Sequence, residues 1–280
     1  MHVIGLGDQV VDKYENIQVM YPGGNAMNFA IFAQKLGVSA AFLGAFGNDA
    51  EAACVEHAAK AEGVDLSHCR HYDGENGCAR VRLENGDRVF MGSNRCGVLR
   101  TVGLHLTKAD DTYLLGFRLI HSSIFSYADE DIQRLHTAGA TISFDFSDCF
   151  APEYLEKMLC FVDFPVFSCS HISMEEMEKL MQTAVTAGCE AVLCTRGAEG
   201  AWLCTGDQIF HQQPHLVKAK DTMAAGDSFL TCFLIRYLQQ IDSGILKEEA
   251  IQSALAQAAE FSAAQCMVDG SFGHGCPFNS

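Results

Sequence analysis

The run Lys220-Asp221-Thr222-Met223-Ala224-Ala225-Gly226-Asp227-Ser228-Phe229 leads into a segment, residues 226–239, that is almost wholly apolar. A helix that is apolar on all sides is buried, so its first turn brings small residues and the carboxylate of Asp227 deep into the protein. The small residues Ala224, Ala225 and Gly226 leave backbone N–H groups accessible at the positive end of the helix. This turn is either an anion site for a phosphate or developing oxyanion, with Asp227 in reach of the reacting group, or a simple helix cap.

Upstream of this run, short β-rich stretches alternate with longer segments of helical periodicity. Repeated strand–helix units predict an α/β fold with a mostly parallel sheet and helices on both faces. No repeat or linker divides the 280 residues, so we expect a single domain over 1–280. The expected strands are 2–6, 39–45, 142–145, 164–167, 191–195 and 201–204, and the expected helices are 25–36, 48–62, 174–187, 226–239 and 247–268.

One segment breaks the α/β alternation. Residues 78–91 contain Asn85-Gly86 between two β-rich runs, and Asn-Gly is the strongest short signal for a β-hairpin. Arg80 and Arg82 alternate with apolar residues, so the hairpin has one polar face, which a sheet covered on both sides cannot hold. We expect it to project as a small β flap with residues 9–21 as its partner; an ordinary surface hairpin is the alternative.

Composition excludes several classes of protein. Thirty-five acidic residues against 19 Lys plus Arg give a net charge of −16, which argues against a nucleic-acid partner or an anionic membrane surface. No apolar run reaches the ~18 residues of a transmembrane helix, and the N-terminus does not have the pattern of a signal peptide. The 13 cysteines have no zinc-site spacing, so we expect small buried hydrophobes in a reducing, cytoplasmic compartment.

A second run that could bind a ligand is Tyr21-Pro22-Gly23-Gly24-Asn25-Ala26-Met27-Asn28. Two glycines before a helix let the backbone approach a ligand closely. Asn25 and Asn28 lie about one turn apart, where their amides would grip sugar hydroxyls. The alternative is a helix start in which Gly23-Gly24 serves only as the turn.

A third run, Cys194-Thr195-Arg196-Gly197-Ala198-Glu199-Gly200, follows a buried strand. Glycines at the carboxyl end of a sheet strand suit a nucleotide crevice, although a plain turn into 201–204 has the same pattern. Neither the P-loop motif nor Gly-x-Gly-x-x-Gly after the first strand occurs, which sets aside P-loop NTPases and ordinary Rossmann dehydrogenases.

Taken together and in this order, these runs resemble the ribokinase-like (PfkB) family of sugar kinases. Gly23-Gly24-Asn25-Ala26-x-Asn28, followed by Gly44-x-x-Gly47-x-Asp49, is similar to the N-terminal signature of that family. Asp221-Thr222-x-Ala224-Ala225-Gly226-Asp227 is similar to its C-terminal signature. The resemblance covers essentially the whole chain. It implies a three-layer α/β sandwich with a small β lid, here segments 9–21 and 78–91, and transfer of the γ-phosphate of ATP to a sugar hydroxyl.

The resemblance also assigns roles to single positions. Asp227 matches the general base, and the backbone amides of Ala224, Ala225 and Gly226 match the anion hole. A carboxylate at its ordinary pKa of ~3.9 is ionised at pH 7, so Asp227 is expected to act as a weak base. On the substrate side the resemblance implies Asp8, Asp12, Gly23, Gly24, Asn25 and Asn28, with Asp12 binding sugar hydroxyls. On the nucleotide side it implies Ser173, Glu176, Thr195, Gly197 and Gly200.

Two metal expectations come with the family. Ser173-Met174-Glu175-Glu176 falls where members have Asn-x-x-Glu, so Glu176 is expected to organise Mg²⁺ through water. Ser173 in place of Asn is a departure that weakens this hydrogen bond. A monovalent cation such as K⁺ near the anion hole is the second expectation, with Asp221 and the region of Gly270 as candidate ligands.

Three short runs resemble the fructosamine-kinase branch of the family, the bacterial fructoselysine 6-kinases: Gly86–Phe90, Phe144–Asp148 and Gly7–Asp12. This resemblance implies a small-molecule acceptor, the 6-hydroxyl of a fructosamine such as fructoselysine. Arg88 would then reach the substrate carboxylate, or it is a solvated strand charge. The alternatives are another PfkB kinase (ribokinase, fructokinase or nucleoside kinase) and a non-catalytic sugar or nucleotide sensor. The exposed hairpin also suggests a homodimer through the lid.

Overall fold

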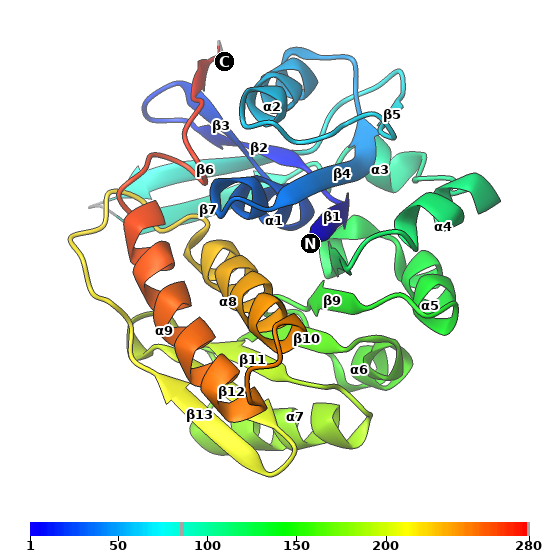
Figure 1. Cartoon of the computed structure of the whole chain (residues 1–280). Helices are drawn as coiled ribbons and strands as arrows, with labels where there is room; N and C mark the ends of the chain where they lie inside the picture. Colours follow the sequence, from blue (N-terminus) through cyan, green and yellow to red (C-terminus); the bar gives the residue numbers. More distant parts are fainter. Residues whose placement is uncertain (85–86, 279–280) are drawn as a thin grey trace.

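The computed structural model describes residues 1–84 and 87–278, without the side chains of residues 83, 84, 87 and 88. Within this part, nine strands form one large sheet in the order β13-β12-β11-β10-β9-β8-β1-β4-β5 (Figure 1). Neighbouring strands are parallel except where β12 meets β11 and β13, so the predicted mostly parallel α/β sheet is confirmed. The strands are β1 (His2–Gly7), β4 (Ser39–Phe46), β5 (Arg70–His71), β8 (Leu119–Ser123), β9 (Ile142–Asp145), β10 (Phe164–Ser168), β11 (Val192–Thr195), β12 (Ala201–Thr205) and β13 (Gln208–Gln212).

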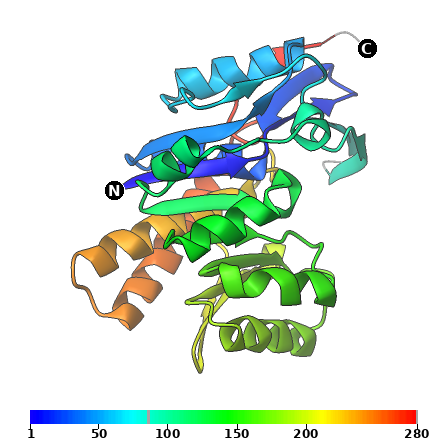
Figure 2. The same cartoon turned by 90° about the vertical axis from the view of Figure 1, so that its right-hand side faces the viewer.

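Helices cover both faces of this sheet, as Figure 2 shows. Side chains alternate between faces along each strand, so Val3 of β1 packs into one apolar core and Ile4 into the other. One core contains α1 (Asn25–Lys35), α2 (Ala50–Ala61), α8 (Ala225–Asp242) and α9 (Lys247–Gln265). The other contains α3 (Val98–Thr101), α4 (Lys108–Leu114), α5 (Asp129–Thr137), α6 (Pro152–Met158) and α7 (Met174–Thr186).

A second, smaller sheet stands beside the large one. Its order among the described residues is β14-β3-β2-β6-β7. Segment 9–21 was expected to give one strand, but it forms a hairpin of two, because Gln18 takes a left-handed conformation (φ 52°) that turns the chain. The strands are β2 (Val10–Tyr14), β3 (Val19–Gly23), β6 (Cys78–Glu84), β7 (Asp87–Ser93) and β14 (Cys276–Pro277).

Strand β8 in the middle of the large sheet was missed by the sequence patterns. Its last three residues, His121-Ser122-Ser123, are polar, yet all are fully buried. His121 stacks on Phe29 with ring centroids 4.7 Å apart, and burial lowers its pKa to about 3, so the ring is neutral. A strand buried through neutral polar groups has no apolar run for a pattern to detect.

The cysteine expectation is met for about half of the residues: seven of the 13, all within the described residues, are buried, and none is in a disulfide. Among the described helices, none combines the length and apolarity that crossing a bilayer requires.

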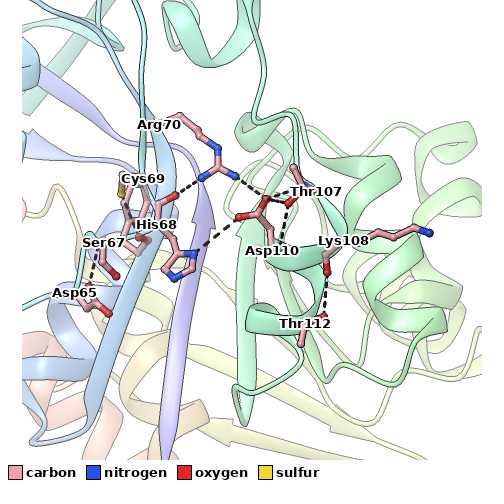
Figure 3. Close-up of polar contacts among 10 residues, drawn as sticks. Asp65, Ser67, His68, Cys69, Arg70, Thr107, Lys108, Asp110 and Thr112 are labelled. Atoms are coloured by element: carbon pink, nitrogen blue, oxygen red, sulfur yellow. Dashed lines mark hydrogen bonds and ion pairs between the residues drawn. The ribbon is translucent and has the colours of Figure 1, made fainter.

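A polar cluster fastens α4 to the segment that leads into β5 (Figure 3). The Arg70 guanidinium donates to an Asp110 carboxylate oxygen at 2.6 Å and to the His68 carbonyl at 2.7 Å. Asp110 also accepts from the backbone N–H and the hydroxyl of Thr107, which caps α4 in return. Burial opposes ionisation of Asp110, but these bonds outweigh it and lower its pKa to about 2.

Asp110→Asn should lower the free energy of unfolding by about 1–2 kcal/mol at pH 7, because Arg70 loses its charged partner. The pKa of Asp110 is lower in the folded than in the unfolded chain. Its contribution is therefore present above about pH 4 and lost as the pH falls through about 2. Urea titrations of both proteins from pH 7 to about 2 measure this difference. Asp111→Asn, which breaks the surface pair with Arg134, is the control; an equal pH dependence in both variants would contradict the assignment.

Candidate active site

The first turn of α8 presents open backbone amides. The helix starts at Ala225 without a side-chain cap, and within the described part of the chain the N–H groups of Gly226 and Asp227 donate to no backbone carbonyl. A Cβ built on Gly226 would meet no atom within 4 Å. The Ala225 carbonyl accepts from the hydroxyls of Ser228 (3.0 Å) and Ser262 (2.8 Å), which hold the turn in place. The positive end of a buried helix therefore opens onto free space, as an anion site requires.

Two cavities meet at this turn. One, of about 620 Å³, is lined by Asp227 together with residues of the small sheet. The other, of about 510 Å³, is lined by Ala225 and Gly226 together with the β11–β12 turn and α9. Adjacent residues of one helix turn thus face different chambers, which we name the Asp227 cavity and the Gly226 cavity. A group bound in one chamber can therefore approach a group bound in the other at Gly226–Asp227.

The surroundings of Asp227 hold its carboxyl group and favour the protonated form. The side-chain amide of Asn28 donates to it at 2.5 Å. Burial raises the pKa of Asp227 to about 8, and the nearby carboxylates of Asp145, Asp8 and Asp12 raise it further, against the Asn28 bond. The sequence-based expectation of an ordinary pKa is therefore wrong, because the pattern did not show that other acids crowd this residue. Asp227 is partly exposed at the cavity surface, where it can meet a ligand.

The structure brings Asp12, Gly23 and Asn28 together beside Asp227. A Cβ on Gly23 would lie 3.0 Å from the Asp12 carboxylate and 3.0 Å from the Ser271 hydroxyl, so only glycine leaves this corner open. The buried Oδ1 of Asn28 has no hydrogen-bond partner within the part of the chain that the structure describes. An unpaired buried acceptor is costly, and a hydroxyl group of a bound ligand would satisfy it.

Asp8 and Asn25 also line the Asp227 cavity, but their polar groups bind within the protein. The Asp8 carboxylate accepts from the hydroxyls of Ser123 (2.8 Å) and Ser126 (2.9 Å) and from the backbone N–H of Asn25 (2.6 Å). It thereby caps α1, whose own N-cap is Gly24 with a left-handed φ of 106°. The Asn25 amide donates to Asp145 at 3.0 Å. Asp8 is placed to position α1, and a direct contact of Asp8 with substrate stays a prediction.

The Gly226 cavity collects Thr195, Gly197 and Gly200 as predicted from the third run. Gly197 and Gly200 have positive φ angles of 54° and 100°, and a Cβ on Gly200 would approach the Gln212 carbonyl to 2.2 Å. Arg196 fixes the turn from behind by donating to the carbonyls of Cys169 (2.8 Å) and Ile172 (2.5 Å). The turn is therefore rigid, with its glycines toward the cavity.

Ser173 and Glu176 form a capping box at the start of α7, and neither lines the two cavities. Glu176 is exposed, and its Oε2 accepts from the Ser173 hydroxyl at 2.7 Å. No group of three His, Cys, Asp or Glu side chains in the described residues is arranged to hold a metal ion. This donor set fits only a magnesium ion that takes most of its ligands from phosphates and water. The Arg88 hypothesis concerns a side chain that lies outside the described residues.

Several lining residues were not found from the sequence. The Asp227 cavity also contains Ser271, Met223, Arg95, Arg100 and Tyr127, and the Gly226 cavity contains Ser262 and the segment 215–217. Met223 belongs to the run at 220–229, whereas the other positions come from loops, from α3 and from α9 and carry no motif; the Gly270 region next to Ser271 is expected from the sequence only as a source of carbonyl oxygens.

The model of the pfkB family carbohydrate kinase matches residues 2–101 and 166–270, which include the first turn of α8 and the Gly23–Asn28 run. The chain belongs to this family. It is 38% identical to the fructosamine kinase FrlD of Bacillus subtilis (strain 168), over 99% of this chain and 95% of that protein. It is 30% identical to the fructoselysine 6-kinase of Escherichia coli (strain K12), over 91% and 95%.

Solved structures of carbohydrate kinases have the same fold as this chain. A fructokinase of Xylella fastidiosa, solved with bound ATP, superposes with a TM-score of 0.78 at 21% identity, covering 97% of this chain and 94% of that one. The predicted ribokinase-like fold is thus confirmed, and the chain is an ATP-dependent carbohydrate kinase, a phosphotransferase that acts on a hydroxyl group.

Asp227→Asn should lower kcat by ~10²–10⁴-fold with little change in KM, because the base is lost while the shape of the site is kept. Wild-type kcat/KM should rise with pH toward a plateau above about 8, where Asp227 is ionised. A folded-state pKa above the unfolded value destabilises the fold as the pH rises between the two values. The variant should therefore be about 1–3 kcal/mol more stable than the wild type at pH 8–9. Steady-state kinetics and urea unfolding measure both; normal turnover in the variant would refute the role.

Gly226→Ala tests the anion site, because it should change phosphate binding without lowering the stability of the helix. The new methyl group would enter the open space at the amides and displace a bound phosphate, so kcat/KM should fall ~10–10³-fold. The φ of Gly226 is not in the left-handed region, and the thermal midpoint should stay equal or rise slightly. Unchanged kinetics would show that nothing binds at this turn.

Proposed function

We propose that this chain transfers the γ-phosphoryl group of ATP to the 6-hydroxyl of a fructosamine, a ketose joined to an amino acid, such as fructoselysine. The observation that supports phosphoryl transfer is that two cavities border the adjacent residues Gly226 and Asp227. The identities of 38% and 30% to a fructosamine kinase and a fructoselysine 6-kinase support the choice of acceptor.

In this proposal ATP occupies the Gly226 cavity, with its phosphates toward the amides of the first turn of α8. The acceptor hydroxyl lies ~2.6–3.2 Å from Asp227, which takes its proton. Asp12 and Asn28 bind the other hydroxyls and fix the direction of attack. The loose transition state needs placement and charge stabilisation more than covalent help, and the amides supply part of that charge stabilisation. The small sheet acts as a lid that excludes water, the competing acceptor.

Two ions belong to the proposal. Mg²⁺ would neutralise phosphate charge, with Glu176 as the residue that holds its water shell. A monovalent cation such as K⁺ would lie near Asp221, whose carboxylate already accepts from Gly270 N–H (3.0 Å), Met223 N–H (2.9 Å) and the Tyr14 hydroxyl (2.7 Å). These bonds tie the loop before α8 to the Gly270 region, where backbone carbonyls would complete the cation shell.

The proposal also includes the cellular location and the oligomeric state of the protein. We place it in the cytoplasm, which supplies ATP and keeps the 13 free cysteines reduced. We also propose a homodimer through the lid, since β7 is an edge strand of the small sheet and exposes Val89 and Met91.

Coupled ADP release with fructoselysine, fructose, ribose and adenosine as acceptors tests the substrate choice. Fructoselysine should give the highest kcat/KM. A preference for ribose, fructose or adenosine would instead favour a ribokinase, fructokinase or nucleoside kinase. ATP turnover with none of these acceptors would favour a sensor.

Asp12→Ala should raise the KM for the sugar substrate by at least ~10-fold, because a charge-assisted hydrogen bond to a hydroxyl is lost. Slow ATP hydrolysis without acceptor should be spared, since Asp12 does not line the Gly226 cavity. Initial rates over a range of acceptor concentrations provide the comparison. An unchanged acceptor KM would mean that Asp12 has a purely structural role.

A further inference from the structure

The Asp227 cavity has a wall to which the sequence motifs assign no role. It consists of Arg95, Arg100, Phe90, Phe125 and Tyr127, which we name the outer wall. All five side chains are at least one third exposed and come from β7, the loop after it, α3 and the segment that follows β8. The inference below rests on the proposed function and concerns which acceptor this wall selects.

The two arginines of the outer wall have no ion-pair partner within the described residues. This is unusual in a chain with 35 acidic residues and a net charge of −16. Their guanidinium groups are therefore available to a ligand. Five other arginines each bridge a carboxylate: Arg70, Arg80, Arg118, Arg134 and Arg196.

The backbone of the outer wall is strained, and the surrounding structure holds it in this conformation. Arg95, Cys96 and Gly97 are consecutive residues with positive φ angles of 55°, 68° and 51°, and Tyr127 has a φ of 51°. For residues other than glycine such angles cost energy, and they persist where the surroundings impose them, often at ligand sites. The Asn94 side chain supplies part of that support, because it bonds the N–H of Cys78 at 2.9 Å and the carbonyl of Asn76 at 2.6 Å.

The guanidinium carbon of Arg100 lies 5.9 Å from the centre of the Tyr127 ring. A cation above an aromatic ring is held in a preferred place at little cost. Tyr127 therefore positions Arg100, and both side chains face the same cavity as Phe90 and Phe125.

The same cavity also carries groups of the reverse charge. Asp8, Asp12 and Asp227 line it, together with the amide of Asn28. These groups suit hydroxyl groups and a cationic amine, whereas the arginines of the outer wall suit an anion. The aromatic rings of the outer wall suit a hydrocarbon chain. A molecule that combines a sugar with an amino-acid carboxylate matches this set of groups in one cavity.

We propose that Arg95 and Arg100 bind the carboxylate of the amino-acid part of the acceptor, and that Phe90, Phe125 and Tyr127 contact its hydrocarbon chain. Guanidinium groups bind a carboxylate through charge-assisted hydrogen bonds, which discriminate strongly against a substrate without it. The outer wall then makes the enzyme selective for sugars that carry an amino acid over sugars that carry a simple amine.

A matched pair of acceptors isolates the carboxylate. Fructoselysine linked through its ε-amine and the fructosyl adduct of cadaverine, which is decarboxylated lysine, share the sugar, the chain and the second amine. Wild-type kcat/KM should be ~10–100-fold higher for fructoselysine. Arg95→Met with Arg100→Met should remove most of that preference, with a much smaller change for the cadaverine adduct. The single Arg→Lys variants should keep part of it, because the charge remains.

Arg118→Met, which breaks a surface pair with Asp242, is the control and should keep the full preference. Equal wild-type activity on both adducts would overturn the inference and leave the proposed function standing. Equal losses on both adducts in the double variant would overturn it as well, since a structural role predicts that result. No turnover of either adduct, with turnover of plain fructose or ribose, would reject the proposed function and the inference together.

Discussion

The hydrogen bond from the Asn28 amide to the Asp227 carboxylate joins helix α1 to helix α8 at the active site. It opposes two effects that favour protonation of Asp227, namely burial and the nearby carboxylates of Asp145, Asp8 and Asp12. The burial of Asp145 raises its own pKa to about 7, with Asp8 adding to the shift. The fold therefore carries an acidic cluster whose charge it cannot fully stabilise. Such a cluster lowers stability, and a site for proton transfer is where a protein retains it.

The position of Asn28 depends in turn on Asp8. Asp8 follows β1 at the carboxyl end of the parallel sheet and caps α1 through the N–H groups of Asn25 and Ala26. Asn28 lies one turn further along that helix, so the cap sets its distance from α8. Asp8 is thus required by the site even though its carboxylate is occupied by protein donors. Residues that position others in this way are as constrained as those that touch a ligand.

The sequence was sufficient for much of this arrangement, and the exceptions have physical reasons. The runs at 23–28 and 220–229 each signal a helix that starts with small residues, and both starts were placed within one residue. Strand β8 was missed because its buried end is polar, and β14 because two residues of the C-terminal segment pair with β3 over a distance that periodicity cannot show. The pKa of Asp227 and the outer wall depend on which side chains meet in space, and no local pattern encodes that.

The distribution of charge in the Asp227 cavity bears on how an acceptor enters it. The carboxylates of Asp8, Asp12 and Asp227 and the two arginines of the outer wall line the same cavity, so it presents groups of both charges to a ligand. A neutral sugar such as fructose gains no orientation from these charges. An acceptor with a cationic amine near its sugar and a carboxylate at its far end would pair each of its charges with groups of the opposite sign. The same cation next to the acidic cluster favours ionised carboxylates, since a nearby positive charge lowers their pKa values. Binding of such an acceptor would therefore help to prepare Asp227 as a base, whereas a neutral sugar would leave it largely protonated at pH 7.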